Sequence, residues 1–81
     1  MDMIVVNLNS IDKVKKFVNT IAKYDCSSEC WNVGGIKVFS ASSIMSIFSL
    51  DFNEPVGVKI NTNDKETAKQ FYKEMRELNE G

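Results

Sequence analysis

Hydrophobic residues follow two different periods along the chain, and each period predicts its own kind of element. Short runs rich in β-branched residues, bounded by polar or glycine-containing segments, are typical of strands. These runs are Met3 to Leu8, Cys26 to Val33, Ile36 to Ser40 and Val56 to Ile60. Gly34 and Gly35 separate the second run from the third and supply the backbone freedom that a tight hairpin needs.

Three other stretches repeat apolar residues at intervals of three and four, which is the spacing of an amphipathic helix. They are Ile11 to Tyr24, Ile44 to Leu50 and Ala68 to Leu78. Ser10 is placed to cap the first helix, and Ser43 the second. Asn63, with Glu66 three residues later, predicts a capping-box start for the third. The second stretch spans only about two turns, so it must pack against the rest of the fold to be stable.

The predicted element order is β-α-β-β-α-β-α, in a single domain of residues 1–81. Each predicted helix has one apolar face, which must be buried against another layer. The pattern therefore predicts an α+β fold in which a four-stranded antiparallel sheet carries the helices on one face. The other face of the sheet would be exposed to solvent, in keeping with its Ser, Lys, Glu and Asn residues.

The charges are balanced, with ten Lys and Arg against eleven Asp and Glu and a net charge of −1 at pH 7. This balance argues against a nucleic acid partner, which would require a basic stripe. No apolar run approaches the roughly 20 residues that span a bilayer. The first run also lacks the basic flank and cleavage site of a signal peptide. The sequence therefore predicts a cytoplasmic protein with no membrane partner.

The chain contains no His, which removes the commonest general base, the commonest metal ligand and any phosphohistidine. Cys26 and Cys30 would share a face of one strand, but roughly 13 Å apart, at about 3.3 Å per residue. A disulfide needs Cα atoms within about 7 Å, so we expect two reduced, partly buried thiols. No phosphate loop or useful carboxylate pair is present, and we predict no enzyme activity, no metal and no cofactor.

One long segment resembles a known family. The stretch "ASSIMSIFSLDFNEPVGVKI", residues 41–60, is similar to the corresponding segment of HPr, the small phosphocarrier of the bacterial phosphoenolpyruvate-dependent sugar phosphotransferase system. "FVNTIAKYD" resembles the end of the first HPr helix, and "NDKETAKQFYKEMREL" resembles the last. The resemblance covers nearly the whole chain and implies the HPr-like open-faced sandwich.

The phosphocarrier motif of HPr is absent from this chain. In that family a His at the start of the first helix, followed by Ala, Arg and Pro, carries the phosphoryl group. Counted back from Tyr24 without gaps, the His position holds Ser10, the Arg position Asp12 and the Pro position Lys13. A serine phosphoester is a poor phosphoryl donor, and Asp in place of Arg repels anions. The resemblance thus implies a member incompetent for phosphohistidine transfer. A carrier using Ser10 or Asp12 and a simple capped helix start both remain open.

A second functional position of the family is retained. In many Gram-positive bacteria the Ser before Ile-Met is phosphorylated by HPr kinase, and the product binds a transcriptional regulator of carbon catabolite repression. Here that Ser is Ser43. The resemblance implies a regulatory, protein-binding paralogue with Ser43 as its phosphorylation site. The implied partner-binding residues are Ser43, Ile44, Met45, Ile47 and Phe48.

Several alternatives stay open at this segment. Ser43 could act only as a helix cap, and the protein could then be a constitutive binding module that uses the ends of the first two helices and has no role in sugar transport. Met45 and Phe48 fit either a surface patch or the core, while Ile44, Ile47 and Leu50 are placed to hold the short helix onto the sheet. We expect a monomer or a weak homodimer.

Overall fold

A computed structural model describes residues 3–24, 26–41 and 44–80, the side chains of residues 44 and 80 excepted. Over these residues the chain forms four strands and three helices. In chain order they are β1 (Ile4–Val6), α1 (Ile11–Ala22), β2 (Ser28–Asn32), β3 (Phe39–Ser40), α2 (Ile44–Ile47), β4 (Val56–Ile60) and α3 (Lys65–Glu80).

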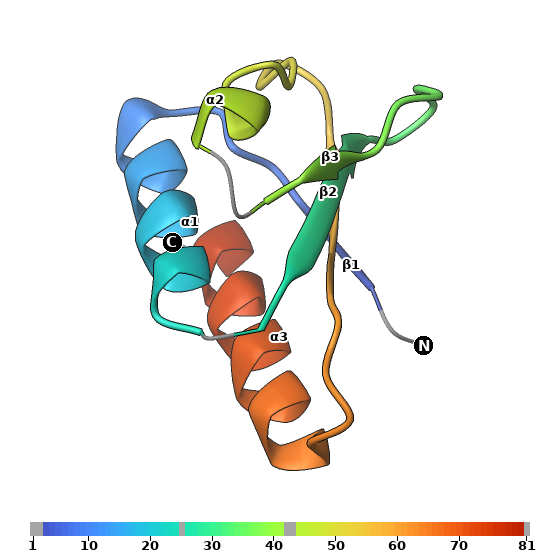
Figure 1. Cartoon of the computed structure of the whole chain (residues 1–81). Helices are drawn as coiled ribbons and strands as arrows, with labels where there is room; N and C mark the ends of the chain where they lie inside the picture. Colours follow the sequence, from blue (N-terminus) through green and yellow to red (C-terminus); the bar gives the residue numbers. More distant parts are fainter. Residues whose placement is uncertain (1–2, 25, 42–43, 81) are drawn as a thin grey trace.

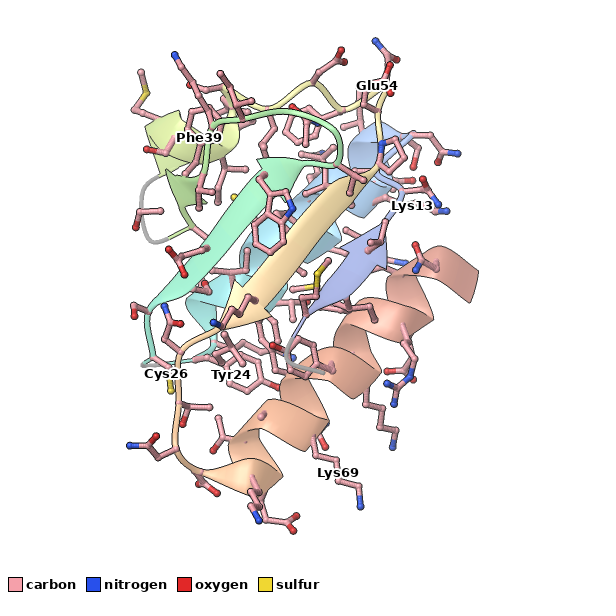
Figure 2. The ribbon with its side chains drawn as sticks, turned by 90° about the vertical axis from the view of Figure 1, so that its right-hand side faces the viewer. Lys13, Tyr24, Cys26, Phe39, Glu54 and Lys69 are labelled. Atoms are coloured by element: carbon pink, nitrogen blue, oxygen red, sulfur yellow. The ribbon has the colours of Figure 1, made fainter. Side chains whose placement is uncertain are left out.

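The four strands form one antiparallel sheet in the order β1-β4-β2-β3. The helices α1 and α3 lie side by side against one face of this sheet, and α2 lies near the start of α1 (Figure 1). After a turn of 90°, the sheet is in front and the long helices are behind it (Figure 2). The predicted α+β fold with a four-stranded antiparallel open sheet is confirmed.

The core lies between the sheet and the helices. Its buried apolar members are Val6, Leu8, Phe17, Ile21, Cys30, Ala41, Ile47, Leu50, Val56, Val58, Ile60, Phe71, Met75 and Leu78. Every element except the two-residue β3 contributes a side chain to this set, and Phe39 of β3 packs against it. The sheet and its helices are therefore held together by a single apolar layer.

The register of the sheet explains one glycine. Trp31 on β2 lies opposite Gly57 on β4. A Cβ added at Gly57 would lie 2.5 Å from an indole carbon of Trp31, closer than atoms can approach. Trp31 therefore packs directly over the backbone of the neighbouring strand, on the face opposite the buried Cys30.

The start of α1 agrees with the prediction. The backbone N–H of Lys13 donates to the Ser10 side-chain oxygen at 3.2 Å, so Ser10 caps the helix. Asp12 lies in the first turn, where a negative charge favours the helix start. The helix itself ends at Ala22, two residues before the predicted end at Tyr24.

The predicted cap of α3 was wrong by one residue. Asp64, rather than Asn63, accepts a hydrogen bond from the Glu66 backbone N–H at 3.1 Å. The Asp64 carboxylate also accepts one from the Thr67 hydroxyl at 2.8 Å, and these bonds lower its pKa. An ionised carboxylate accepts such bonds more strongly than a carboxamide and suits the positive end of the helix dipole.

The predicted strand boundaries were too wide. The clearest case is β3, which pairs with β2 only at Phe39 and Ser40 instead of from Ile36. A turn does form at the two glycines, because the Gly35 N–H donates to the Asn32 carbonyl at 2.8 Å and Gly34 has φ of 90°. The turn does not close a tight hairpin, because the Val33 N–H before it donates to the Pro55 carbonyl. After the turn the chain leaves the sheet until Phe39.

The cysteines follow the prediction for free thiols. Both Cys26 and Cys30 are unpaired by disulfides, with Cys30 buried on β2 and Cys26 partly exposed before the strand begins. Burial raises the pKa of Cys30 to about 11, so its reactive thiolate form is scarce at neutral pH.

Candidate functional site

An apolar groove lies at the end of the molecule where α1 begins. It has a volume of about 870 Å³ and runs between the first half of α1 and the connection from α2 to β4. Figure 2 shows Lys13 of α1 and Glu54 of that connection at this end, away from Tyr24 and Cys26. We call it the α1–α2 groove. Its apolar lining consists of Leu8, Ile11, Val14, Val18, Phe48 and Phe52.

Large apolar side chains are exposed around the α1–α2 groove. Ile11 is 74% exposed and Phe48 is 59% exposed, and both line it. Met45, on α2, is 80% exposed. Monomeric proteins rarely expose several such side chains together unless they form an interaction site. Aromatic and Met side chains are enriched in protein interfaces, whose centres exclude charged residues. The site thus has the character of a protein-binding surface.

The short α2 is held in place by the core, which fixes Phe48 at the rim. Ile47 is 1% exposed, and Leu50 is buried with it. The Leu50 N–H donates to the Ile47 carbonyl at 3.1 Å, which closes the end of the helix tightly. A helix this short is not stable alone, so burial of these two side chains orients the exposed ones.

The predicted partner-binding residues fall into three groups. Met45 and Phe48 are exposed, which selects the surface alternative for both. Ile47 was predicted as a partner contact, but its burial leaves no surface to offer, because its side chain fills the core beneath α2. Ser43 and the side chain of Ile44 lie outside the described residues.

Ser10 and Asp12, at the positions of the phosphocarrier motif, lie at the start of α1. Both are exposed, and Ser10 lines the groove. The Ser10 oxygen is the acceptor of the capping bond from Lys13. The chain has no His to serve as the base that usually activates such a hydroxyl. The arrangement supports a capped helix start beside a binding surface.

Two further residues with shifted pKa values, Tyr24 and Glu74, meet near the other end of α1. Glu74 of α3 pairs with the Lys23 ammonium and accepts a hydrogen bond from the Tyr24 hydroxyl. The bond from Lys23, then that from Tyr24, lowers the pKa of Glu74. Burial, followed by the bond to Glu74, raises the pKa of Tyr24 to about 12. This cluster joins α1 to α3 and lies far from the groove along α1 (Figure 2).

Metal binding has no obvious place in the part of the chain that the structure describes, where no group of three or more Cys, Asp or Glu side chains is arranged around a common point. Within the same residues, none of the helices combines the length and apolarity needed to cross a membrane.

Sequence reasoning named the ends of the first two helices as a possible binding face, but none of the apolar α1 side chains that line the groove. The predicted apolar stripe of α1 includes Ile11, Val14 and Val18 as well as the buried Phe17 and Ile21. That stripe is wider than one core-facing row requires, and its width was the available signal. Phe52, in the connection from α2 to β4, also lines the groove, and its role depends on how that connection folds against α1.

Comparisons with known proteins add no family assignment: no family model matches the chain, and no curated protein matches it.

Proposed function

We propose that this protein is a non-catalytic binding module of HPr-like architecture, which binds a protein partner at the α1–α2 groove. The observation that carries the proposal is the groove itself, where exposed Ile11 and Phe48 line an apolar surface between α1 and the connection from α2 to β4. The α+β fold with its four-stranded antiparallel sheet is compatible with the HPr-like architecture that the sequence resemblance implies.

The proposal assigns no phosphohistidine transfer to the protein. Ser10 stands at the family's His position and is used as a helix cap. Asp12 stands at the Arg position and adds negative charge where a carrier would attract an anion. The start of α1 lines the groove, but it carries none of the residues that a phosphohistidine carrier needs.

Regulation by phosphorylation of Ser43 is part of this proposal and rests on the sequence. Ser43 directly precedes Ile44, the first residue of α2. A phosphate there would add about two negative charges and three strong hydrogen-bond acceptors just before α2 in the sequence. A transcriptional regulator of carbon catabolite repression is the partner class that the HPr resemblance suggests. The alternative is a constitutive binding module that uses the same groove without phosphorylation.

A matched pair of variants tests the groove. Phe48→Asp places a charge at its rim, whereas Ile36→Asp places one on the hairpin loop, where Ile36 is 99% exposed. In affinity capture from cells of the source, we expect partners bound by wild type and by Ile36→Asp to be lost with Phe48→Asp. Equal recovery by all three proteins would exclude the groove as the binding surface.

Phosphorylation is tested separately. Incubation with HPr kinase and ATP should add one phosphoryl group to the wild type and none to Ser43→Ala, as read by intact mass. Incorporation that persists in Ser43→Ala, or is absent from the wild type, would leave the constitutive alternative. Incubation with phosphoenolpyruvate and enzyme I should leave the mass unchanged, and a gain of one phosphoryl group would overturn the proposal of lost carrier function.

A further inference from the structure

The outer edge of β1 is occupied by a side chain. Among the described residues β1 is an end strand of the sheet, and none of the other strands lies along its outer side. On that side the Asn79 side-chain NH₂ donates to the Val5 carbonyl at 2.9 Å, and the Asn7 N–H donates to the Asn79 side-chain oxygen at 2.9 Å. The last turns of α3, which carry Asn79, lie beside β1 in Figure 2.

These two bonds are those that another strand would make. Backbone groups of residues two apart in a strand point to the same side, so the Val5 carbonyl and the Asn7 N–H form one pairing slot on the outer edge. A carboxamide carries one donor face and one acceptor, as a peptide group does. Asn79 therefore fills the slot with the same two bonds that an incoming antiparallel strand would form.

We propose that Asn79 is an edge guard, which keeps β1 from pairing with the β1 strand of a second copy of this chain. Exposed strand edges are templates for pairing, and proteins protect them by short strands, charges or covering elements. At the other end of the sheet, β3 pairs over only two residues and is protected by its shortness. β1 belongs to a longer apolar run and depends on Asn79.

The second copy is the occupant that the sequence of β1 favours. Residues 3–7 read Met-Ile-Val-Val-Asn, which contain no charge, no Pro and no Gly and are rich in β-branched residues. Such a segment is typical of strands that pair with themselves. Antiparallel self-pairing centred on Val5 would place Ile4 opposite Val6, with no charges opposed. The two sheets would then join into one through a two-fold axis.

The position of Asn79 at the β1 edge depends on the order of the last turn of α3. Leu78 and Met75 are buried and hold this part of the helix on the core, while Asn79 itself is exposed. Helix ends fray more readily than helix centres. Opening of the last turn withdraws Asn79 and uncovers the slot, so the order of the α3 end controls self-association of β1.

The experiment compares Asn79→Ala with Asn63→Ala, which removes a carboxamide from an exposed position just before α3. In dilute solution, where the variant is monomeric, Asn79→Ala should raise the hydrogen-exchange rate of the Asn7 amide about tenfold, because that N–H loses its partner. At higher concentration it should form dimers or larger species in light scattering. Asn63→Ala should do neither. A double variant, Asn79→Ala with Val5→Lys, should return to monomer, because a charge on an edge strand opposes pairing.

Two outcomes would overturn the proposal. One is an Asn79→Ala protein that is folded and stays monomeric up to about 1 mM, a range in which exposed edges associate. The other is an association that Val5→Lys does not reverse, because it would then use another surface. If Asn79→Ala fails to fold by circular dichroism, Asn79→Ser decides. Its uncharged side chain is too short to make both edge bonds, and it must associate for the proposal to stand.

Discussion

The two ends of α1 use the same kinds of residue for opposite purposes. At the Tyr24 end, aromatic side chains are packed and tied by hydrogen bonds: the rings of Tyr24 and Phe71 meet edge to face with centroids 5.2 Å apart. At the Ser10 end, Phe48 and Ile11 stand open around a groove. One end holds α1 to α3 and the other presents a surface. Separating stability from binding in this way lets the groove stay apolar without endangering the fold.

The largest predicted effect comes from the packed end. Phe71 is fully buried and contacts both Tyr24 and Tyr72, the latter at a centroid distance of 5.4 Å. We expect Phe71→Ala to lower the free energy of unfolding by about 3–5 kcal/mol, since it leaves a cavity and removes two ring contacts. Urea denaturation followed by tryptophan fluorescence measures it. A loss below about 1 kcal/mol would show that this end does not carry the stability assigned to it.

A smaller effect is expected from the Tyr24 hydroxyl. Tyr24→Phe removes its bond to Glu74 and should cost about 0.5–1.5 kcal/mol at neutral pH. The ring contact with Phe71 is retained, so the loss should be well below that of Phe71→Ala. Chemical denaturation of both proteins under one set of conditions makes the comparison. Equal losses would mean that the hydrogen bond, and not the packing, dominates this end.

The same variant should also change how stability depends on pH. Burial raises the pKa of Tyr24 from 10.0 to about 12 in the folded protein. The neutral hydroxyl is therefore favoured by folding, and its contribution is complete below pH 10 and lost as the pH rises toward 12. Tyr24→Phe should lose less stability than wild type across that interval. The lowered pKa of Glu74 acts in the opposite sense, because its contribution is present above its unfolded pKa and lost as acid protonates the folded carboxylate.

The fold was predictable wherever local sequence decides the structure. Periodicity gave the helices and the strongest strand, and the Ser10 cap depends only on a bond to Lys13, three residues away. Asn63 and Asp64 are both good capping residues, so the choice between them was made by the geometry of the loop. β3 was overpredicted because Ile36 and Val38 have the composition of a strand but are exposed in the loop.

The candidate site was less predictable, since it is assembled from distant segments. Met45 and Phe48 were recognised as possible surface residues, yet sequence alone could not separate surface from core. The contacts of Asn79 join residues 72 and 74 positions apart, and nothing local marks that Asn among the others in the chain. Such contacts follow from topology, which composition and periodicity do not specify.

The smallest effect on stability should come from exposed residues near the Ser10 end of α1. This prediction tests most directly whether the two ends of α1 differ in function. Phe48→Ala removes a large side chain that is 59% exposed, and Met45→Ala one that is 80% exposed. Neither fills the core, so each should change the free energy of unfolding by no more than about 0.5 kcal/mol. Phe48→Ala should nevertheless weaken partner capture, because Phe48 lines the groove. A loss of several kcal/mol from Phe48→Ala would mean that its ring is buried in the core in solution and that the groove is closed. Both ends of α1 would then stabilise the fold, and neither would present a binding surface.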